Sequence, residues 1–110
     1  VVVCTPVDCV AGMILAASKH VRPGTIFTDA GSTKQNIVWD LAGKLPDHYP
    51  YVPAHPIAGA EKAGVEHARA DLFQDRVTIV TPAEFGADDK VLVRVEGFWQ
   101  ALGSKVVRMS

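Results

Sequence analysis

Three short segments of the 110-residue sequence carry side chains that could transfer a proton or bind a ligand. Each segment follows an apolar run and offers backbone N–H groups, hydroxyls or ionisable groups, as acid–base chemistry and the binding of anionic ligands require. The candidate residues are Thr5 and Pro6 in the first segment, Asp29, Gly31 and Ser32 in the second, and His55 and Glu61 in the third.

His55 is the sharpest candidate for a catalytic base. It lies between Ala54 and Pro56, and a proline ring limits the residue before it to extended conformations. The backbone that carries the imidazole is therefore restrained, and histidine side chains exchange protons near neutral pH. From spacing alone a lone histidine is more often structural than catalytic, so both alternatives stay open. The other histidines have no comparable setting and are predicted at the surface: His20, His48 and His67.

Ser32 precedes a helix-like segment and has Gln35 three residues later, which is the pattern of a capping box. As an N-cap it would stabilise the helix by about 1 kcal/mol, and its hydroxyl could face a ligand at the same time. Glu61 could orient His55 or a substrate-binding cation, or could be a solvated loop charge. Lys34 lies in the first helical turn, where a cation is mildly unfavourable, and this hints weakly at a ligand role.

Strand-like and helix-like segments alternate along the chain. We predict strands over 1–5, 25–29, 51–54, 76–81 and 105–109, and helices over 8–22, 32–45 and 88–102. A short helix over 65–73 and an ordered loop over 55–64 complete the prediction. The β–α–β order indicates an α/β fold with a parallel sheet, because parallel strands need long crossovers. The direction of the last two strands stays open.

Each long helix has an apolar face at spacings of three and four residues. Asp8 is the predicted N-cap of the first helix, Pro23-Gly24 its end, and Gly103 the end of the last. The residues predicted to point inward are Val10, Met13, Ile14, Ala17, Val21, Ile37, Val38, Trp39, Leu41, Leu45, Val91, Leu92, Val95, Phe98, Trp99 and Leu102.

The three candidate segments follow three successive strands. In an open α/β sheet, ligands bind beyond the carboxyl ends of the strands. The sequence therefore predicts that Ser32 and His55 lie on neighbouring strand tips at one rim of the sheet.

Composition limits the function classes. Hydrophobic residues make up 48% and charged residues 21%, as in a soluble globular domain. The net charge is -1 with no run of Lys or Arg, so we expect no nucleic-acid partner, and no apolar run is long enough for a membrane span. Cys4 and Cys9 form no metal motif, so no metal is expected. We predict both to be small, buried and reduced, as is usual in the cytoplasm.

Residues 53–64, Pro-Ala-His-Pro-Ile-Ala-Gly-Ala-Glu-Lys-Ala-Gly, closely resemble the His-Pro-(Ile/Met)-Ala-Gly-x-Glu-x-x-Gly signature of prephenate and arogenate dehydrogenases. Residues 28–34 resemble the Asp-x-Gly-Ser-x-Lys segment of that family, and the Thr-Pro-Val turn at 5–7 also matches. The order and separation of the motifs agree, and the resemblance covers nearly the whole chain. One departure is Ala63, where the family often has Ser.

The resemblance implies a Rossmann-like, doubly wound, mostly parallel sheet. It also implies oxidation of the ring hydroxyl of prephenate or arogenate by hydride transfer to NAD or NADP, with loss of CO₂, in tyrosine biosynthesis. His55 would accept the hydroxyl proton, and Ser32 would hydrogen-bond near the nicotinamide and His55.

The other matching positions would bind rather than react. Thr5, Pro6, Asp29 and Gly31 would contact the dinucleotide, together with Ser32. Glu61 would belong to the polar network at the substrate entrance.

Two family features are missing from the sequence: a Gly-x-Gly-x-x-Gly fingerprint and an all-helical C-terminal domain with the substrate arginine and the dimer interface. We therefore expect residues 1–110 to be a single domain, part of the nucleotide-binding domain of a longer homodimeric enzyme. Alone it should bind NAD weakly or not at all and should not turn over.

Two other functions are compatible with the sequence. One is a Rossmann dehydrogenase of β-hydroxy acids, although these typically use a lysine base from the next domain. The other is a non-catalytic nucleotide- or protein-binding module, in which His55 is structural. Neither prephenate against arogenate nor NAD against NADP is decided by the sequence.

Overall fold

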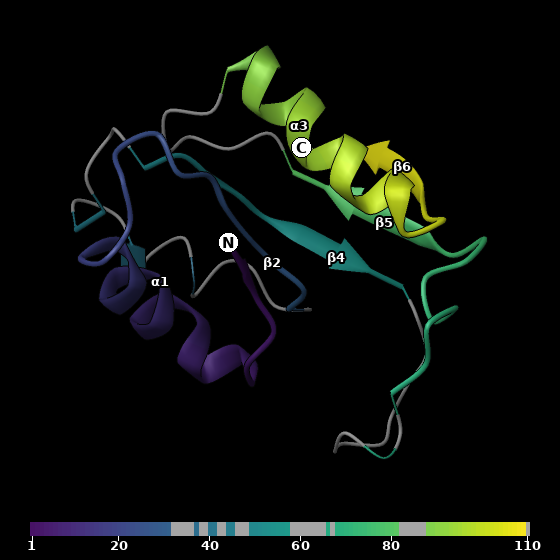
Figure 1. Ribbon diagram of the computed structural model, residues 1–110, viewed down its shortest axis with the longest axis horizontal. Helices are drawn as coiled ribbons and strands as arrows, with labels where there is room; N and C mark the ends of the chain where they lie inside the picture. Colours follow the sequence, from purple (N-terminus) through teal and green to yellow (C-terminus); the bar gives the residue numbers. More distant parts are fainter. Residues whose placement is uncertain are drawn as a thin grey trace.

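The chain is seen in a computed structural model that describes residues 1–31, 37, 40–41, 44–45, 49–57, 66, 68–81 and 88–109. Within these residues the strands are β1 (Val2–Val3), β2 (Phe27–Asp29), β3 (Tyr51–Val52), β4 (Ala54–Pro56), β5 (Val77–Val80) and β6 (Lys105–Arg108). A 3₁₀ turn η1 (Val7–Cys9) leads into helix α1 (Val10–Ser18), and helix α3 (Asp89–Ala101) precedes β6 (Figure 1).

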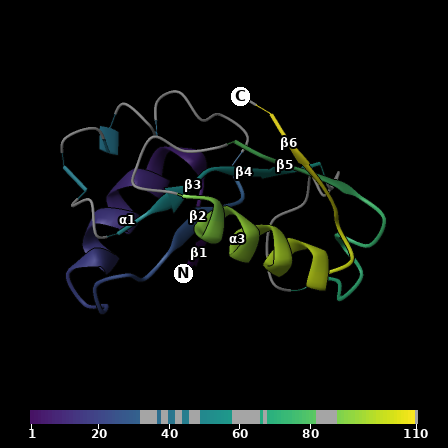
Figure 2. The same ribbon diagram turned by 90° about the horizontal axis from the view of Figure 1, so that it is seen from above.

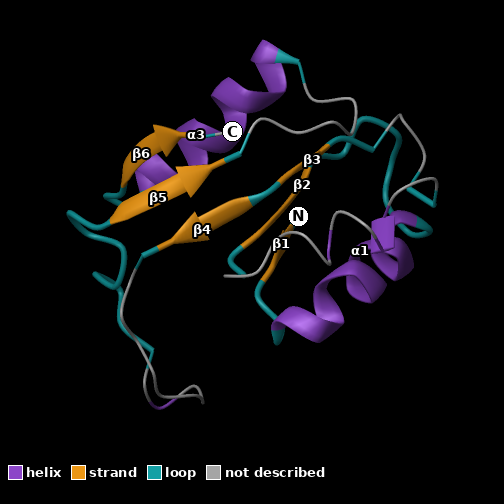
Figure 3. Ribbon diagram, turned by 180° about the vertical axis from the view of Figure 1, so that it is seen from behind, coloured by secondary structure: helices purple, strands orange, loops and turns teal. Residues whose placement is uncertain are grey.

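The strands form two groups, which are joined where β3 continues into β4. Strands β1, β2 and β3 are parallel neighbours in that order, whereas β4 is antiparallel to β5 and β5 is parallel to β6. Strand β4 follows directly on β3 (Figure 3), with only Pro53 between them. The carbonyl of Pro53 accepts the N–H of Thr81 at 3.0 Å. Among the described strands, β5 and β6 therefore run against β1–β3, and the prediction of a mostly parallel sheet is confirmed.

Each face of the strands packs against a different helix. Successive side chains of a strand point to opposite faces, and Tyr51 joins one core cluster whereas Val52 joins the other. The first cluster contains the buried side of α1, and the second contains the buried side of α3. The two helices lie on opposite sides of the strands (Figures 1 and 2). Helices on both faces are the doubly wound arrangement that the sequence predicts.

Helix α3 agrees most closely with the sequence prediction. The side chain of Asp88 accepts the N–H of Val91 at 3.0 Å and caps the helix. Gly103 ends it at φ +89°, a conformation that L side chains rarely adopt, and a Cβ there would lie 3.2 Å from the Cα of Gln74, so glycine is strongly favoured. Phe98 is 41% exposed, so the prediction that it points inward is wrong.

The reason is the width of the contact between α3 and the sheet. Leu92, Val95 and Trp99 form the buried stripe, and Phe98 lies beside it, packing edge-on against Trp99 at 5.2 Å between ring centroids. Leu102 follows the end of the helix and is also exposed, contrary to prediction.

Helix α1 differs from its prediction at both ends. It begins at Val10, after a turn closed by the N–H of Cys9 and the carbonyl of Pro6 at 2.8 Å, so Asp8 is not its N-cap. It ends at Ser18, before Pro23-Gly24. Its buried side begins at Val10 and excludes Met13, which is exposed. The 3₁₀ turn η1 decides where the helix begins, and the spacing of apolar residues in the sequence does not predict such a turn.

Three further predictions need correction. His55 and Pro56 lie in β4 rather than in a loop, because they pair with β5. Residues 68–75, in the region of the predicted 65–73 helix, include turns and no helix. Both cysteines are free but exposed rather than buried.

The segment predicted as the 32–45 helix is described at only a few positions. Ile37 and Leu41 are helical and buried, and Leu45 is buried, as predicted. The proposed capping box, Val38 and Trp39 lie outside the described residues.

Candidate active site

The carboxyl ends of β1, β2 and β3 lie side by side. Val3 is the register partner of Asp29, and Thr28 is the partner of Val52. The N–H of Ala30 donates to the carbonyl of Val3 at 3.2 Å, which joins the first two tips just beyond the strands. The tips of β1 and β2, which carry Thr5 and Gly31, therefore lie together at one rim, and β3 continues through Pro53 into β4, which carries His55. Ser32 lies outside the described residues, so its predicted place beside His55 stays a prediction.

His55 projects from a strand that is held on one side by β5. It is the register partner of Ile79, and the adjacent N–H of Ile57 donates to the carbonyl of Val77 at 2.7 Å. Ala54 is buried in the cluster under α3, so alternation directs His55 to the other face. Its side chain is partly exposed, so the imidazole is restrained in position and accessible to a ligand.

Asp29 is a fully buried carboxylate at this rim, with an exposed fraction of 0%. Its Oδ1 accepts the hydroxyl of Tyr51 at 2.9 Å and the N–H of Ala54 at 3.2 Å. Its Oδ2 accepts the N–H of Gly31 at 2.9 Å. We call these four residues the Asp29 cluster. It joins the end of β2 to the start of β4.

Burial and the negative field of Asp29 affect two neighbouring groups. Burial, followed by the charge of Asp29 and its hydrogen bond, raises the pKa of Tyr51 far above the ordinary range, so the phenol stays a donor. Partial desolvation and then Asp29 raise the pKa of the Cys4 thiol. Cys4 is therefore protonated at neutral pH and is a poor nucleophile.

Thr5 has a buried hydroxyl at the tip of β1. The oxygen is buried and has no hydrogen-bond partner among the described residues. A buried polar group without a partner costs about 1–3 kcal/mol. A polar ligand atom at this tip would satisfy it, and Pro6, next to it, is exposed.

Several predicted site residues are not described. Ser32, Lys34 and Glu61 lie outside the described residues, as does Ala63. Within the described ranges, no group of three or more His, Cys, Asp and Glu side chains could hold a metal ion. A bilayer-crossing helix would have to be longer and more apolar than any helix in the described part of the chain.

Sequence reasoning named Asp29 only as a dinucleotide contact. It missed Tyr51 and Ala54 as partners of this carboxylate, since they lie 22 and 25 residues further along the chain. The only local signal is the Asp-x-Gly spacing, which is typical of a side chain that accepts the N–H two residues on.

The sequence matches a known family over nearly its whole length. A family model described as prephenate dehydrogenase, nucleotide-binding domain, matches residues 1–108. The chain is 31% identical over 110 residues to the cyclohexadienyl dehydrogenase of Zymomonas mobilis, a match that covers 100% of this chain and 37% of that protein.

Solved structures of similar proteins have the same fold. Prephenate dehydrogenase from Aquifex aeolicus, in complex with hydroxyphenyl propionate and NAD⁺, matches with a TM-score of 0.86 and 33% identity over 99% of this chain and 37% of that one. Arogenate dehydrogenase from Synechocystis matches with a TM-score of 0.85 and 25% identity over 99% and 38%. These structures confirm the Rossmann-like α/β fold, and this chain spans little more than a third of their length.

Proposed function

The chain belongs to the prephenate dehydrogenase family, as a nucleotide-binding domain, and we propose that the longer protein that carries it oxidises prephenate with a nicotinamide dinucleotide. The ring hydroxyl becomes a carbonyl, the ring carboxylate leaves as CO₂, and the product is 4-hydroxyphenylpyruvate. In this proposal residues 1–110 are one domain of a longer, homodimeric enzyme of tyrosine biosynthesis. The two free thiols of residues 1–110, Cys4 and Cys9, are consistent with a place in the cytoplasm.

The observation that carries the proposal is the placement of His55. A partly exposed imidazole stands on a strand end that β5 and Asp29 hold from two sides. In the proposed reaction a nitrogen of His55 accepts the proton of the substrate hydroxyl, so positive charge does not build up on the carbon that is oxidised. Ser32 would hydrogen-bond next to it, and Glu61 would belong to the polar entrance.

The dinucleotide would lie along the tips of β1 and β2. The buried Thr5 hydroxyl, which has no hydrogen-bond partner among the described residues, fits a polar ligand there. Pro6 and Gly31 lie on the same rim segments and Ser32 follows in the sequence, whereas Asp29, with its side chain fully buried, would shape this rim without touching the dinucleotide. When bound, NAD or NADP supplies the hydride acceptor. The chain's own task is to orient the substrate and the imidazole, because aromatisation provides the driving force.

Substituting His55→Asn in the full-length protein tests this role. We expect kcat to fall about 10³-fold while the melting temperature stays unchanged, because a positioned general base contributes about 10²- to 10⁴-fold. The matched control is His20→Asn at an exposed histidine, which should keep full activity. Retained turnover in the His55 variant, or loss of folding, would show that His55 is structural.

Substrate choice is tested on the same full-length protein. We expect turnover with prephenate to exceed turnover with arogenate and with β-hydroxy acids, measured as kcat/KM with NAD and with NADP. A preference for arogenate would keep the site and change the substrate. A preference for a β-hydroxy acid would remove the proposed function.

A further inference from the structure

One buried carboxylate contacts the two segments that carry the predicted catalytic pair. Gly31, whose N–H donates to Asp29, immediately precedes Ser32 in the sequence. Ala54, whose N–H donates to the same side chain, immediately precedes His55. Asp29 thus makes one hydrogen bond to the backbone of each of these two segments.

The contact with Gly31 is local, but the contact with Ala54 is not. A side chain that accepts the N–H two residues on is a common turn feature and by itself fixes only its own turn. The N–H of Ala54 comes from 25 residues further along the chain. Because both oxygens belong to one rigid carboxylate, the two N–H groups are held at a set separation.

Tyr51 fixes the orientation of this carboxylate. Its hydroxyl donates to the same Oδ1 that accepts Ala54, and both Tyr51 and Asp29 have exposed fractions of 0%. The side chains of Tyr51 and His55 lie on the same face by alternation, away from α3. The Asp29 cluster is therefore buried on the face that presents His55.

We propose that Asp29 is a positioning residue that sets the distance between the backbones of Gly31 and Ala54, the residues directly before Ser32 and His55 in the sequence, by accepting a hydrogen bond from the N–H group of each. This inference rests on the proposed function, because it takes those two residues as the catalytic pair. Asp29 itself transfers no proton. Its effect on rate comes from alignment, and a misplacement of about 1 Å can cost about 10²-fold.

The decisive variant is Asp29→Asn in the full-length protein. An amide offers a single acceptor oxygen, so it cannot accept on both sides, and one of the two backbone N–H groups loses its partner. We expect hydrogen exchange at Gly31 or Ala54 to accelerate at least about tenfold, since exchange reports local opening. We also expect kcat to fall about 10- to 100-fold with KM for the dinucleotide changed less than about twofold.

Thr28→Val is the matched control. Its hydroxyl also makes a buried bond across the same pair of strands, to the carbonyl of Val52 at 2.7 Å, but it touches neither Gly31 nor Ala54. The control should lose stability and keep kcat. Should Asp29→Asn fail to fold, Tyr51→Phe decides, because it removes the hydroxyl that orients the carboxylate and keeps the carboxylate itself. A several-fold fall in kcat is expected.

Two results would overturn the inference. One is unchanged exchange at both Gly31 and Ala54 in Asp29→Asn or, if that fails to fold, unchanged kcat in Tyr51→Phe. The other is an equal loss of kcat in Asp29→Asn and Thr28→Val, which would make the effect one of general stability. Failure of the wild-type protein to oxidise prephenate or arogenate would instead end the proposed function. The exchange measurement would still decide whether Asp29 holds the two segments.

Discussion

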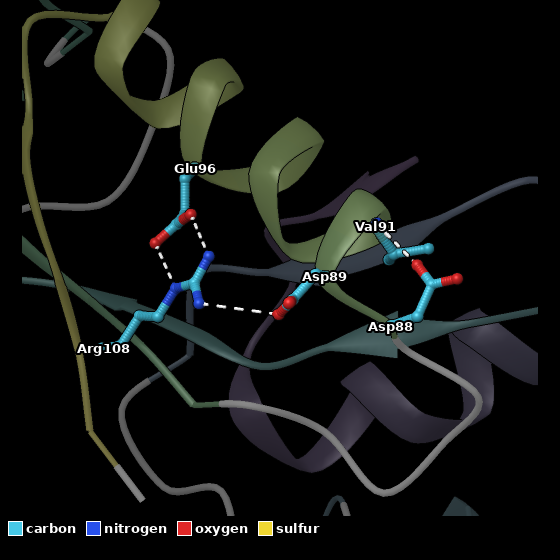
Figure 4. Close-up of polar contacts among 5 residues, drawn as sticks. All are labelled: Asp88, Asp89, Val91, Glu96 and Arg108. Carbon is cyan, nitrogen blue, oxygen red and sulfur yellow. Dashed lines mark hydrogen bonds and ion pairs between the residues drawn. The ribbon is translucent and has the colours of Figure 1, made fainter.

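Two polar clusters join distant parts of this chain, one around a buried carboxylate and one around a surface guanidinium. In the Asp29 cluster one carboxylate accepts, from the described residues, hydrogen bonds of 2.9–3.2 Å from β3, β4 and the turn after β2. In the Arg108 cluster, Nε and Nη2 of Arg108 each donate to Glu96 at 2.7 Å, and Nη1 lies 3.8 Å from Asp89 (Figure 4). The surface bonds are the shorter ones.

Shorter bonds do not make the surface cluster the stronger one. The Arg108 side chain is 41% exposed and that of Asp89 is 91% exposed, so water and salt compete for both. The three donors to Asp29 lose their partner without replacement if the carboxylate is removed. The comparison predicts that changes in the Asp29 cluster cost far more than changes in the Arg108 cluster.

The largest effect is expected for Asp29→Ala. Two buried donors, the Tyr51 hydroxyl and the Ala54 N–H, and the part-buried N–H of Gly31 lose their acceptor. Each buried loss costs about 1–3 kcal/mol, so the free energy of unfolding should fall by about 3 kcal/mol or more. Denaturant unfolding of the full-length protein measures it. The control is Asp88→Ala, which removes the exposed cap of α3 and should cost about 1 kcal/mol. Equal losses in the two variants would refute the comparison.

Tyr51→Phe should have an intermediate effect that depends on pH. At neutral pH the loss of one hydrogen bond should cost about 1 kcal/mol. Because the pKa of Tyr51 is raised in the folded state, the unfolded chain loses its phenol proton first above about pH 10, and wild-type stability falls as pH rises. The difference between wild type and variant should therefore stay constant at lower pH and shrink as pH rises through and above about 10. A difference that stayed constant through this rise would contradict the assigned donor.

The smallest effect is expected in the Arg108 cluster. Arg108→Ala should lower the melting temperature by about 1–2 °C in low salt and less in high salt. Arg69→Ala, in an ion pair with both side chains 64% exposed, should change nothing measurable.

Acid should weaken the same cluster. The hydrogen bond from Arg108 lowers the pKa of Glu96, so its stabilisation is present above the ordinary glutamate range and is lost as pH falls through and below about 4. The Arg108–Glu96 pair is assigned as a weak, screened surface ion pair. This assignment would be contradicted if the stabilisation from Glu96 were already lost at neutral pH, or if the change in melting temperature of Arg108→Ala did not depend on salt.

Local sequence patterns predicted residues 76–109 well. The apolar stripe and Gly103 define α3, and the strands on either side of it follow from β-branched runs. These features need only neighbours within a few residues. The cap at Asp88 was found only in the structure. The errors at Met13 and Phe98 arose because helical spacing indicates a side of the helix, whereas the width of the sheet decides which residues on that side are covered.

The candidate site was likewise predicted only in part from local sequence patterns. The residue types and motifs identified His55 and Asp29 from the sequence, but the strand around His55 exists only because Val77–Val80 pairs with it.

The sequence by itself determined the alternation of helices and strands, the turn at Ala30-Gly31 and the family signature around His55, because these depend on short-range spacing. Only the tertiary structure decided that Asp29 also binds the hydroxyl of Tyr51 and the N–H group of Ala54, and that Cys4 and Cys9 are exposed. Such contacts join residues far apart in the chain, and burial depends on what packs above a residue. No local pattern carries that information.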